Sequence, residues 1–110
     1  MKRLEPSPAR RRQLWRDALE ELRTEWPAPY PVRVQRRQLR DSWGTCQLLE
    51  KPKRFVITID PRAQFSFQLM ILAHEWAHAL DWESTQEHGT DHGDTWGLWQ
   101  ARAYRAISSD

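Results

Sequence analysis

Apolar residues spaced three and four positions apart form the first regular pattern in the chain. The pattern follows Ser7-Pro8, which resembles the N-cap and first-turn proline of a helix, and it runs to about Thr24. It predicts an amphipathic helix whose apolar face consists of Leu14, Trp15, Ala18, Leu19 and Leu22. Three prolines between residues 27 and 31 end this helix and predict an extended loop.

Three segments with alternating or β-branched residues come next and predict strands. The first is Val32–Leu39, the second is Thr45–Glu50 and the third is Arg54–Ile59. Turn residues at 41–44 separate the first two strands, and Lys51-Pro52-Lys53 joins the second to the third. The third strand is the clearest of them because it is rich in β-branched residues.

A longer apolar segment follows the strands. The residues from Gln64 to about Trp82 include neither glycine nor proline, and they predict a largely buried helix. The polar segment Glu83–Asp91 predicts a loop, and His92–Ile107 predicts a final helix. We therefore expect an α+β fold in which a small three-stranded antiparallel sheet packs against an N-terminal helix, a central helix and a C-terminal helix.

The composition favours a single domain over residues 1–110, and the first seven residues are expected to form a disordered basic tail. Hydrophobic residues make up 39% of the 110 residues and charged residues 29%, which is a globular balance. The longest apolar run, Leu69–Ala73, is far shorter than the roughly 20 residues of a membrane span. The single cysteine, Cys46, excludes an internal disulfide, and no apolar signal segment is visible. We expect a cytoplasmic monomer with no membrane partner.

The motif with the clearest chemistry is His74-Glu75-Trp76-Ala77-His78, an H-E-x-x-H sequence on the central predicted helix. Residues four apart share one face of a helix, so both imidazoles can reach one zinc ion. Glu75 is placed beside that ion, where it can act as a general base towards water that the metal has made acidic. Without a metal, these polar side chains would need other partners in an apolar helix. The motif therefore predicts a Zn²⁺-dependent hydrolase.

A catalytic zinc ion usually has three protein ligands, and the sequence offers several candidates for the third. The position six after the motif, where one class of zinc protease has its third histidine, is Ser84. His92 is the best candidate because it opens the last predicted helix, and Trp96 one turn later can pack that helix against the central one. The other candidates lie close by in the sequence: His88, Asp91 and Asp94.

These residues resemble those of the SprT-like zinc metallopeptidases, in which H-E-x-x-H is followed later by H-G-x-x-aromatic. His92-Gly93-Asp94-Thr95-Trp96 is similar to the second sequence, and Ser42-Trp43-Gly44-Thr45-Cys46 resembles the hairpin before the family's active-site helix. The resemblance covers about residues 8–107. It implies a minimal zincin without a C-terminal zinc ribbon, acting on a polypeptide substrate. It also implies that His74, His78 and His92 bind zinc and that Glu75 is the general base.

The charge distribution points to another kind of partner. Residues 1–16 carry six basic side chains and one acidic side chain, whereas residues 55–110 carry three basic and eight acidic ones. The basic front half is compatible with nucleic-acid binding, and some SprT-like enzymes cleave proteins bound to DNA. A solvated surface is the simpler explanation. Two alternatives to a peptidase stay open: a non-catalytic zinc-stabilised module that binds DNA or protein, and a basic adaptor with residual peptidase activity.

Three further residues have more than one interpretation. Asp81 lies on the helix face of the histidines, where it either orients an imidazole or forms a solvated helix end. Cys46 is expected to be a small buried residue rather than a nucleophile. Trp43 is either a core residue or part of the wall of a substrate cleft. An edge strand of the sheet is expected to hold the substrate by backbone pairing.

Overall fold

The N-terminal pattern folds as predicted. In the computed structural model, which describes residues 5–83, helix α1 spans Pro8–Glu25. Ser7 is its N-cap, and the Ser7 Oγ accepts a hydrogen bond from the Arg10 N–H at 3.2 Å. Trp15, Ala18 and Leu22 are buried. The apolar face predicted from the spacing is therefore the face that packs against the rest of the fold.

Three strands form one sheet, with β1 at Val32–Arg36, β2 at Gly44–Leu49 and β3 at Arg54–Ile59. β3 has the bounds predicted for the third strand. β1 ends three residues before the predicted end because the chain leaves the sheet after Arg37, whose N–H donates to the Ile59 carbonyl at 3.1 Å. The Leu39 N–H donates instead to the Asp60 carboxylate at 2.9 Å.

The sheet is mixed, so the prediction of a fully antiparallel sheet is wrong. The strand order is β1-β3-β2, and β3 pairs antiparallel with β2 but parallel with β1. The chain reverses between β1 and β2 and again between β2 and β3, so β1 and β3 run in the same direction. β3 takes the central position because it is the most apolar strand, and its Phe55, Ile57 and Ile59 are fully buried.

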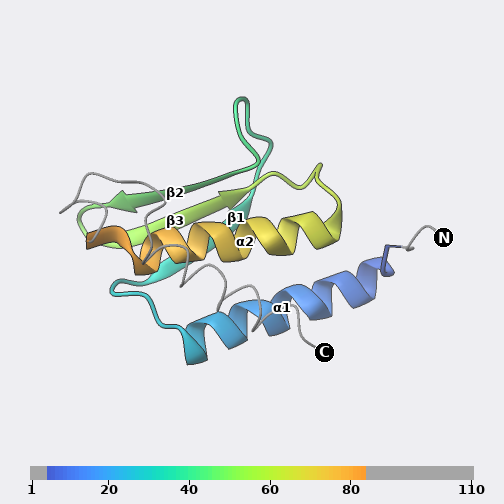
Figure 1. Cartoon of the computed structure of the whole chain (residues 1–110), viewed down its shortest axis with the longest axis horizontal. Helices are drawn as coiled ribbons and strands as arrows, with labels where there is room; N and C mark the ends of the chain where they lie inside the picture. The colour runs from blue at the N-terminus through green and yellow to red at the C-terminus, as the bar shows by residue number, and fades with distance from the viewer. Residues whose placement is uncertain (1–4, 84–110) are drawn as a thin grey trace.

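Helix α2, Phe65–Leu80, lies between the sheet and α1 (Figure 1). It begins one residue after the predicted start and ends two residues before the predicted end. The Phe65 N–H donates to Glu5 Oε1 at 3.1 Å, and the Trp76 Nε1–H donates to the Trp26 carbonyl at 2.8 Å. Leu72, Ala73 and Trp76 lie in the core between the sheet and α1. Within residues 5–83, two helices and a small sheet confirm the α+β class.

Several predictions from the sequence fall outside the described residues. The predicted final helix and nearly all of the predicted loop, with His88 and His92, belong to residues 84–110. Residues 1–4 of the expected basic tail also lie outside, whereas Glu5 makes the hydrogen bond to α2. Within residues 5–83, no helix combines the length and the apolar character needed to cross a membrane.

Candidate functional site

His74 and His78 lie one turn apart on α2, side by side as their spacing predicts. Their ring centroids are 5.0 Å apart, and the ring planes are inclined by 70°. Both residues are half-buried, whereas Ala73 and Ala77, which precede each of them, are fully buried. The helix therefore presents two imidazoles together at the boundary between the core and the solvent.

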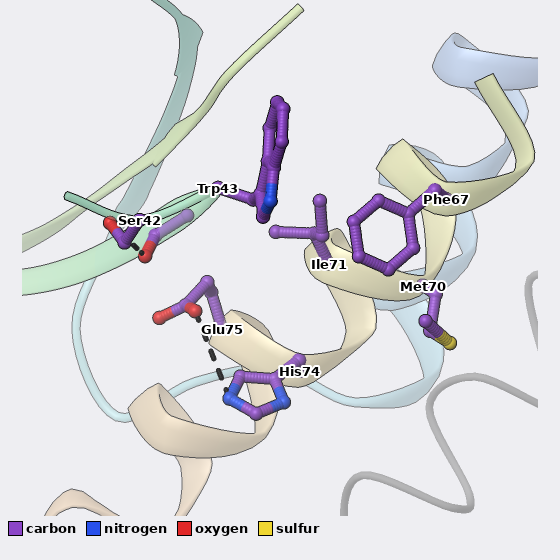
Figure 2. Close-up of a pocket in the computed structure, with 8 residues that line it drawn as sticks. Ser42, Trp43, Phe67, Met70, Ile71, His74 and Glu75 are labelled. Atoms are coloured by element: carbon purple, nitrogen blue, oxygen red, sulfur yellow. Dashed lines mark hydrogen bonds and ion pairs between the residues drawn. The ribbon is translucent and has the colours of Figure 1, made fainter. Parts of the chain in front are cut away.

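Glu75 lies beside His74 where α2 meets the start of β2 (Figure 2). It is only 7% exposed, and its Oε2 is 3.9 Å from His74 Nε2. A Cβ placed on Gly44 would lie 3.3 Å from the Glu75 Cγ and Oε2 atoms, and it would overlap the Ile71 side chain. Gly44 therefore lets β2 approach α2 closely and holds the carboxylate in a narrow space.

Cys46 follows two residues after Gly44 on β2 and packs half-buried against the core. Its burial, and then the negative charge of Glu75, raise the pKa of the Cys46 thiol to about 12. The thiol therefore stays protonated at neutral pH. This agrees with the expectation that Cys46 is a small packing residue and not a nucleophile.

A pocket of about 370 Å³ opens between the start of β2 and α2 (Figure 2). One wall is formed by residues 42–44, which include Trp43, and the other by Phe67, Met70 and Ile71. His74 and Glu75 also line it. Of the two interpretations of Trp43, the structure supports the cleft wall, since the side chain is exposed and lines the pocket.

Phe67 and Met70 line the pocket, although neither is predicted from the sequence as a site residue. Both fall in an apolar segment that was expected to be largely buried. They nevertheless precede His74 by seven and four positions, which places them on the same face of α2 as the two histidines. The series 67, 70, 74 and 78 was therefore the available signal for this face.

The loop that carries Trp43 is fixed by Asp60, a fully buried residue directly after β3. The Asp60 carboxylate accepts from the Leu39 N–H at 2.9 Å and pairs with Arg62, whose Nη2 lies 2.7 Å from Oδ2. The Asp60 N–H donates to the Trp43 carbonyl at 2.9 Å. The hydrogen bonds from Arg62 hold the pKa of Asp60 well below its usual range. Arg62 also lies over the Trp43 ring, 5.8 Å from its centroid.

The predicted third metal ligand, His92, lies outside the residues that the structure describes. Within residues 5–83, no group of three or more His, Cys, Asp or Glu side chains is arranged to hold a metal ion. The candidates His92 and His88 are outside that range. Asp81 is the C-cap of α2 and is only 4% exposed, so the alternative of a solvated helix end is wrong. Its role in orienting an imidazole stays a prediction.

A scan against protein-family models, a search of curated proteins and a search of solved structures each return no match. The likeness to the SprT-like zinc metallopeptidases therefore rests on the motif residues of the sequence. The features that bear on function are the imidazole pair, the carboxylate beside it and the pocket that His74 and Glu75 line.

Proposed function

We propose that this protein is a zinc-dependent peptidase in which His74 and His78 bind the metal together with His92, and Glu75 is the general base. One arrangement carries the proposal. Two imidazole rings lie 5.0 Å apart, and a buried carboxylate oxygen lies 3.9 Å from one of them. The resemblance of the motif residues to SprT-like metallopeptidases supports the same roles.

The donor chemistry of the pair is suited to zinc. Imidazole nitrogen binds zinc at about 2.0–2.1 Å, and ligands from one helical turn can bind the same ion. When bound, zinc supplies a Lewis acid that polarises a substrate carbonyl and lowers the pKa of water. The half-buried position of the two rings favours an accessible site over one sealed in the core.

Glu75 is placed to move protons during hydrolysis. In the proposed reaction, its carboxylate accepts a proton from the attacking water and then donates it to the amine of the leaving peptide. Its close packing against Gly44 restricts the orientations that the carboxylate can adopt. Less orientational freedom then has to be lost on the way to the transition state.

β2 is suited to holding an extended substrate. It lies at one end of the strand order β1-β3-β2 and pairs with β3 alone among the described strands. A peptide that adds to the other side of β2 would be held by backbone hydrogen bonds, whatever its side chains. It would pass Gly44 and therefore Glu75. This geometry favours a polypeptide over a small ester or amide.

Metal content and proteolysis test the proposal together. The zinc-loaded full chain, after desalting, is expected to retain about one zinc ion by plasma mass spectrometry and to cleave β-casein. His74→Ala and His78→Ala should each lose both properties. His92→Ala should also lose zinc, while His88→Ala should keep it; the reverse result would make His88 the third ligand. Full zinc occupancy with no cleavage of casein or histones would favour the non-catalytic zinc module.

A basic surface favours a second candidate role, nucleic-acid binding. Arg33, Arg37 and Arg40 are exposed along β1 and the loop that follows it. Arginines in such a row can contact successive phosphates, and binding of that kind weakens steeply as salt is raised. If duplex DNA binds in a salt-dependent way after zinc has been removed, the basic surface acts independently of the metal. That result would favour the basic nucleic-acid adaptor over a protein that acts only as a peptidase.

A further inference from the structure

The apolar residues that folding leaves uncovered are concentrated at one place. Among the described residues, three large hydrophobic side chains are exposed: Trp43 at 47%, Phe67 at 37% and Met70 at 38%. All three line the pocket that His74 and Glu75 also line. Scattered apolar residues on a surface need no explanation, but a cluster beside convergent polar side chains indicates a binding site.

The pocket has the dimensions of a site for one bulky side chain. Its volume of about 370 Å³ is near the lower end of the roughly 300–1,000 Å³ range of ligand sites. Trp43 and Phe67 (Figure 2) stand at 77° to each other with ring centroids 6.4 Å apart. Ile71, which also lines the pocket, is buried and belongs to the core. Edge-to-face rings and the thioether of Met70 are favourable neighbours for a further aromatic ring.

The walls differ in how firmly they are held. The backbone at Trp43 is tied to the buried Asp60, and Arg62 lies over the Trp43 ring. Met70, on the opposite wall, is an unbranched side chain that adapts its shape to a ligand. A fixed aromatic wall that faces an adaptable one favours selection by size and aromatic character. Among the described residues, the lining includes no lysine or arginine, so an acidic guest would lose hydration without gaining a basic partner there.

We propose that this pocket receives an aromatic side chain of the peptide substrate, next to the bond that is cleaved. The proposal rests on the peptidase function and adds the substrate class. A peptide paired with β2 would pass Gly44, and alternate side chains of an extended strand point to the same side. One such side chain would enter the pocket beside Trp43, Phe67 and Met70 while the adjacent peptide bond lies beside Glu75. Trp43, Phe67 and Met70 are then specificity residues.

Binding to a catalytically inert protein tests the pocket separately from catalysis. Fluorescein-labelled peptides that differ only in a central Phe, Leu, Gly or Asp are titrated with zinc-loaded Glu75→Gln protein, and binding is followed by fluorescence polarisation. The Phe peptide should bind about ten-fold more tightly than the Gly or Asp peptide. Adding Trp43→Ala, or Phe67→Ala as an independent second variant, should remove most of that difference. Equal affinities for the Phe, Gly and Asp peptides would overturn the proposal.

Tyr30→Ala is the control, because it also removes an aromatic ring, but one that does not line the pocket. Tyr30 contacts Phe55 near the start of β3, whereas Gly44, beside the pocket, pairs with Ile59 at the end of β3. This variant should keep the ten-fold preference, and loss of the preference in it would contradict a local role for the pocket. Sedimentation supplies another check: if Phe67→Asp converts a dimer into a monomer, the apolar cluster binds a second copy and the substrate pocket is wrong.

The same peptides, incubated with zinc-loaded wild-type protein and analysed by mass spectrometry, separate the two proposals. Cleavage adjacent to Phe, and slower cleavage of the Gly and Asp peptides, would support both. A Phe preference in binding with no cleavage of any peptide would overturn the peptidase function but keep a peptide-binding pocket. Cleavage that is indifferent to the central residue, together with equal binding, would keep the peptidase and overturn the pocket.

Discussion

The two faces of α2 are built from similar apolar residues, yet the fold uses them differently. On one face, Phe65, Leu72 and Trp76 are buried among the sheet and α1. On the other face, Phe67 and Met70 are in line with the motif histidines, and more than a third of each is exposed. Burial on the first face stabilises the fold, whereas the second face keeps apolar area that a ligand can still bury.

The position of β2 explains the difference. β2 begins level with Ile71 and Glu75, where Gly44 approaches α2. From there, β2 runs towards the C-terminal end of α2. Its Leu48 pairs with Phe55, and Phe55 contacts Trp82, which follows α2. No strand among the described residues therefore covers the part of α2 that carries Phe67 and Met70. Because β2 begins beyond Phe67 and Met70, this apolar part of α2 stays exposed and is available to bind a ligand.

The largest expected effect is on catalysis. Glu75→Gln keeps the shape of the side chain but removes the base, so cleavage should fall by about 10²–10⁴-fold while bound zinc stays unchanged. The measurement is kcat/KM on the Phe peptide alongside metal content. Glu83→Gln makes the same chemical change at an exposed position and should leave both unchanged. Full activity in Glu75→Gln would remove this carboxylate from the mechanism.

The buried face should respond most strongly in stability. Trp76→Ala removes a buried ring and its hydrogen bond to Trp26, and it should lower the free energy of unfolding by about 3–5 kcal/mol. Phe67→Ala, on the exposed face, should cost less than about 1 kcal/mol. Urea denaturation followed by circular dichroism measures both. Similar losses in the two variants would show that the two faces are not distinct.

Gly44→Ala tests the close approach that separates the faces. The added methyl group would overlap Ile71 and crowd the Glu75 carboxylate, so we expect a loss of about 1–3 kcal/mol in stability and slower cleavage. Stability is measured by urea denaturation, and the rate of cleavage is compared with that of the wild type at a temperature where the variant is fully folded. Gln47→Ala, at an exposed position of the same strand, should change neither. Wild-type behaviour of Gly44→Ala would mean that β2 and α2 are further apart than described.

The Asp60 pair predicts a dependence of stability on acid. The pKa of Asp60 is lowered in the folded state, so its contribution is present above the unfolded value of about 3.9 and is lost as the pH falls further. Asp60→Asn should therefore be less stable at pH 7, with a shallower decline below about pH 4. Urea midpoints at pH 7, 4 and 3 give this slope. Parallel curves for the wild type and the variant would contradict the pairing with Arg62.

The smallest effect concerns Cys46. The pKa of the Cys46 thiol is raised to about 12 in the folded protein, whereas it is about 8.5 in the unfolded chain. The free energy of unfolding is therefore unaffected by this thiol below about pH 8.5, and it falls as the pH rises from there towards the folded value, because the unfolded chain ionises first. At pH 8 the thiol should react much more slowly with a disulfide reagent in the folded protein than in urea. Cys46→Ala should leave peptide cleavage unchanged. Rapid labelling of the folded protein would show that the thiol is ionised and accessible.

Local patterns predicted the elements well. β3 was predicted with its observed bounds, and α2 to within two residues, because β-branched residues and an apolar segment free of glycine and proline express local preferences. The juxtaposition of His74 and His78 follows from helical periodicity alone. These are features that neighbouring residues determine among themselves.

Contacts between distant segments were not predictable in the same way. The parallel pairing of β1 with β3 depends on which strand takes the centre of the sheet, and alternation within each strand does not encode that choice. The Asp60 carboxylate accepts a hydrogen bond from the N–H of Leu39, which lies 21 positions earlier in the chain. The residues around Leu39 and Asp60 do not predict this hydrogen bond. The pocket likewise requires two elements to meet, so Phe67 and Met70 looked like core residues.

X-ray absorption at the zinc K-edge tests the central claim most directly. The claim is that the face of α2 with His74 and His78 binds a metal. In the zinc-loaded full chain, we expect nitrogen or oxygen ligands at about 2.0–2.1 Å with the scattering pattern of imidazole, and loss of that pattern in His78→Ala. A sulfur ligand at about 2.3 Å, or an unchanged spectrum in His78→Ala, would place the metal elsewhere and contradict the account.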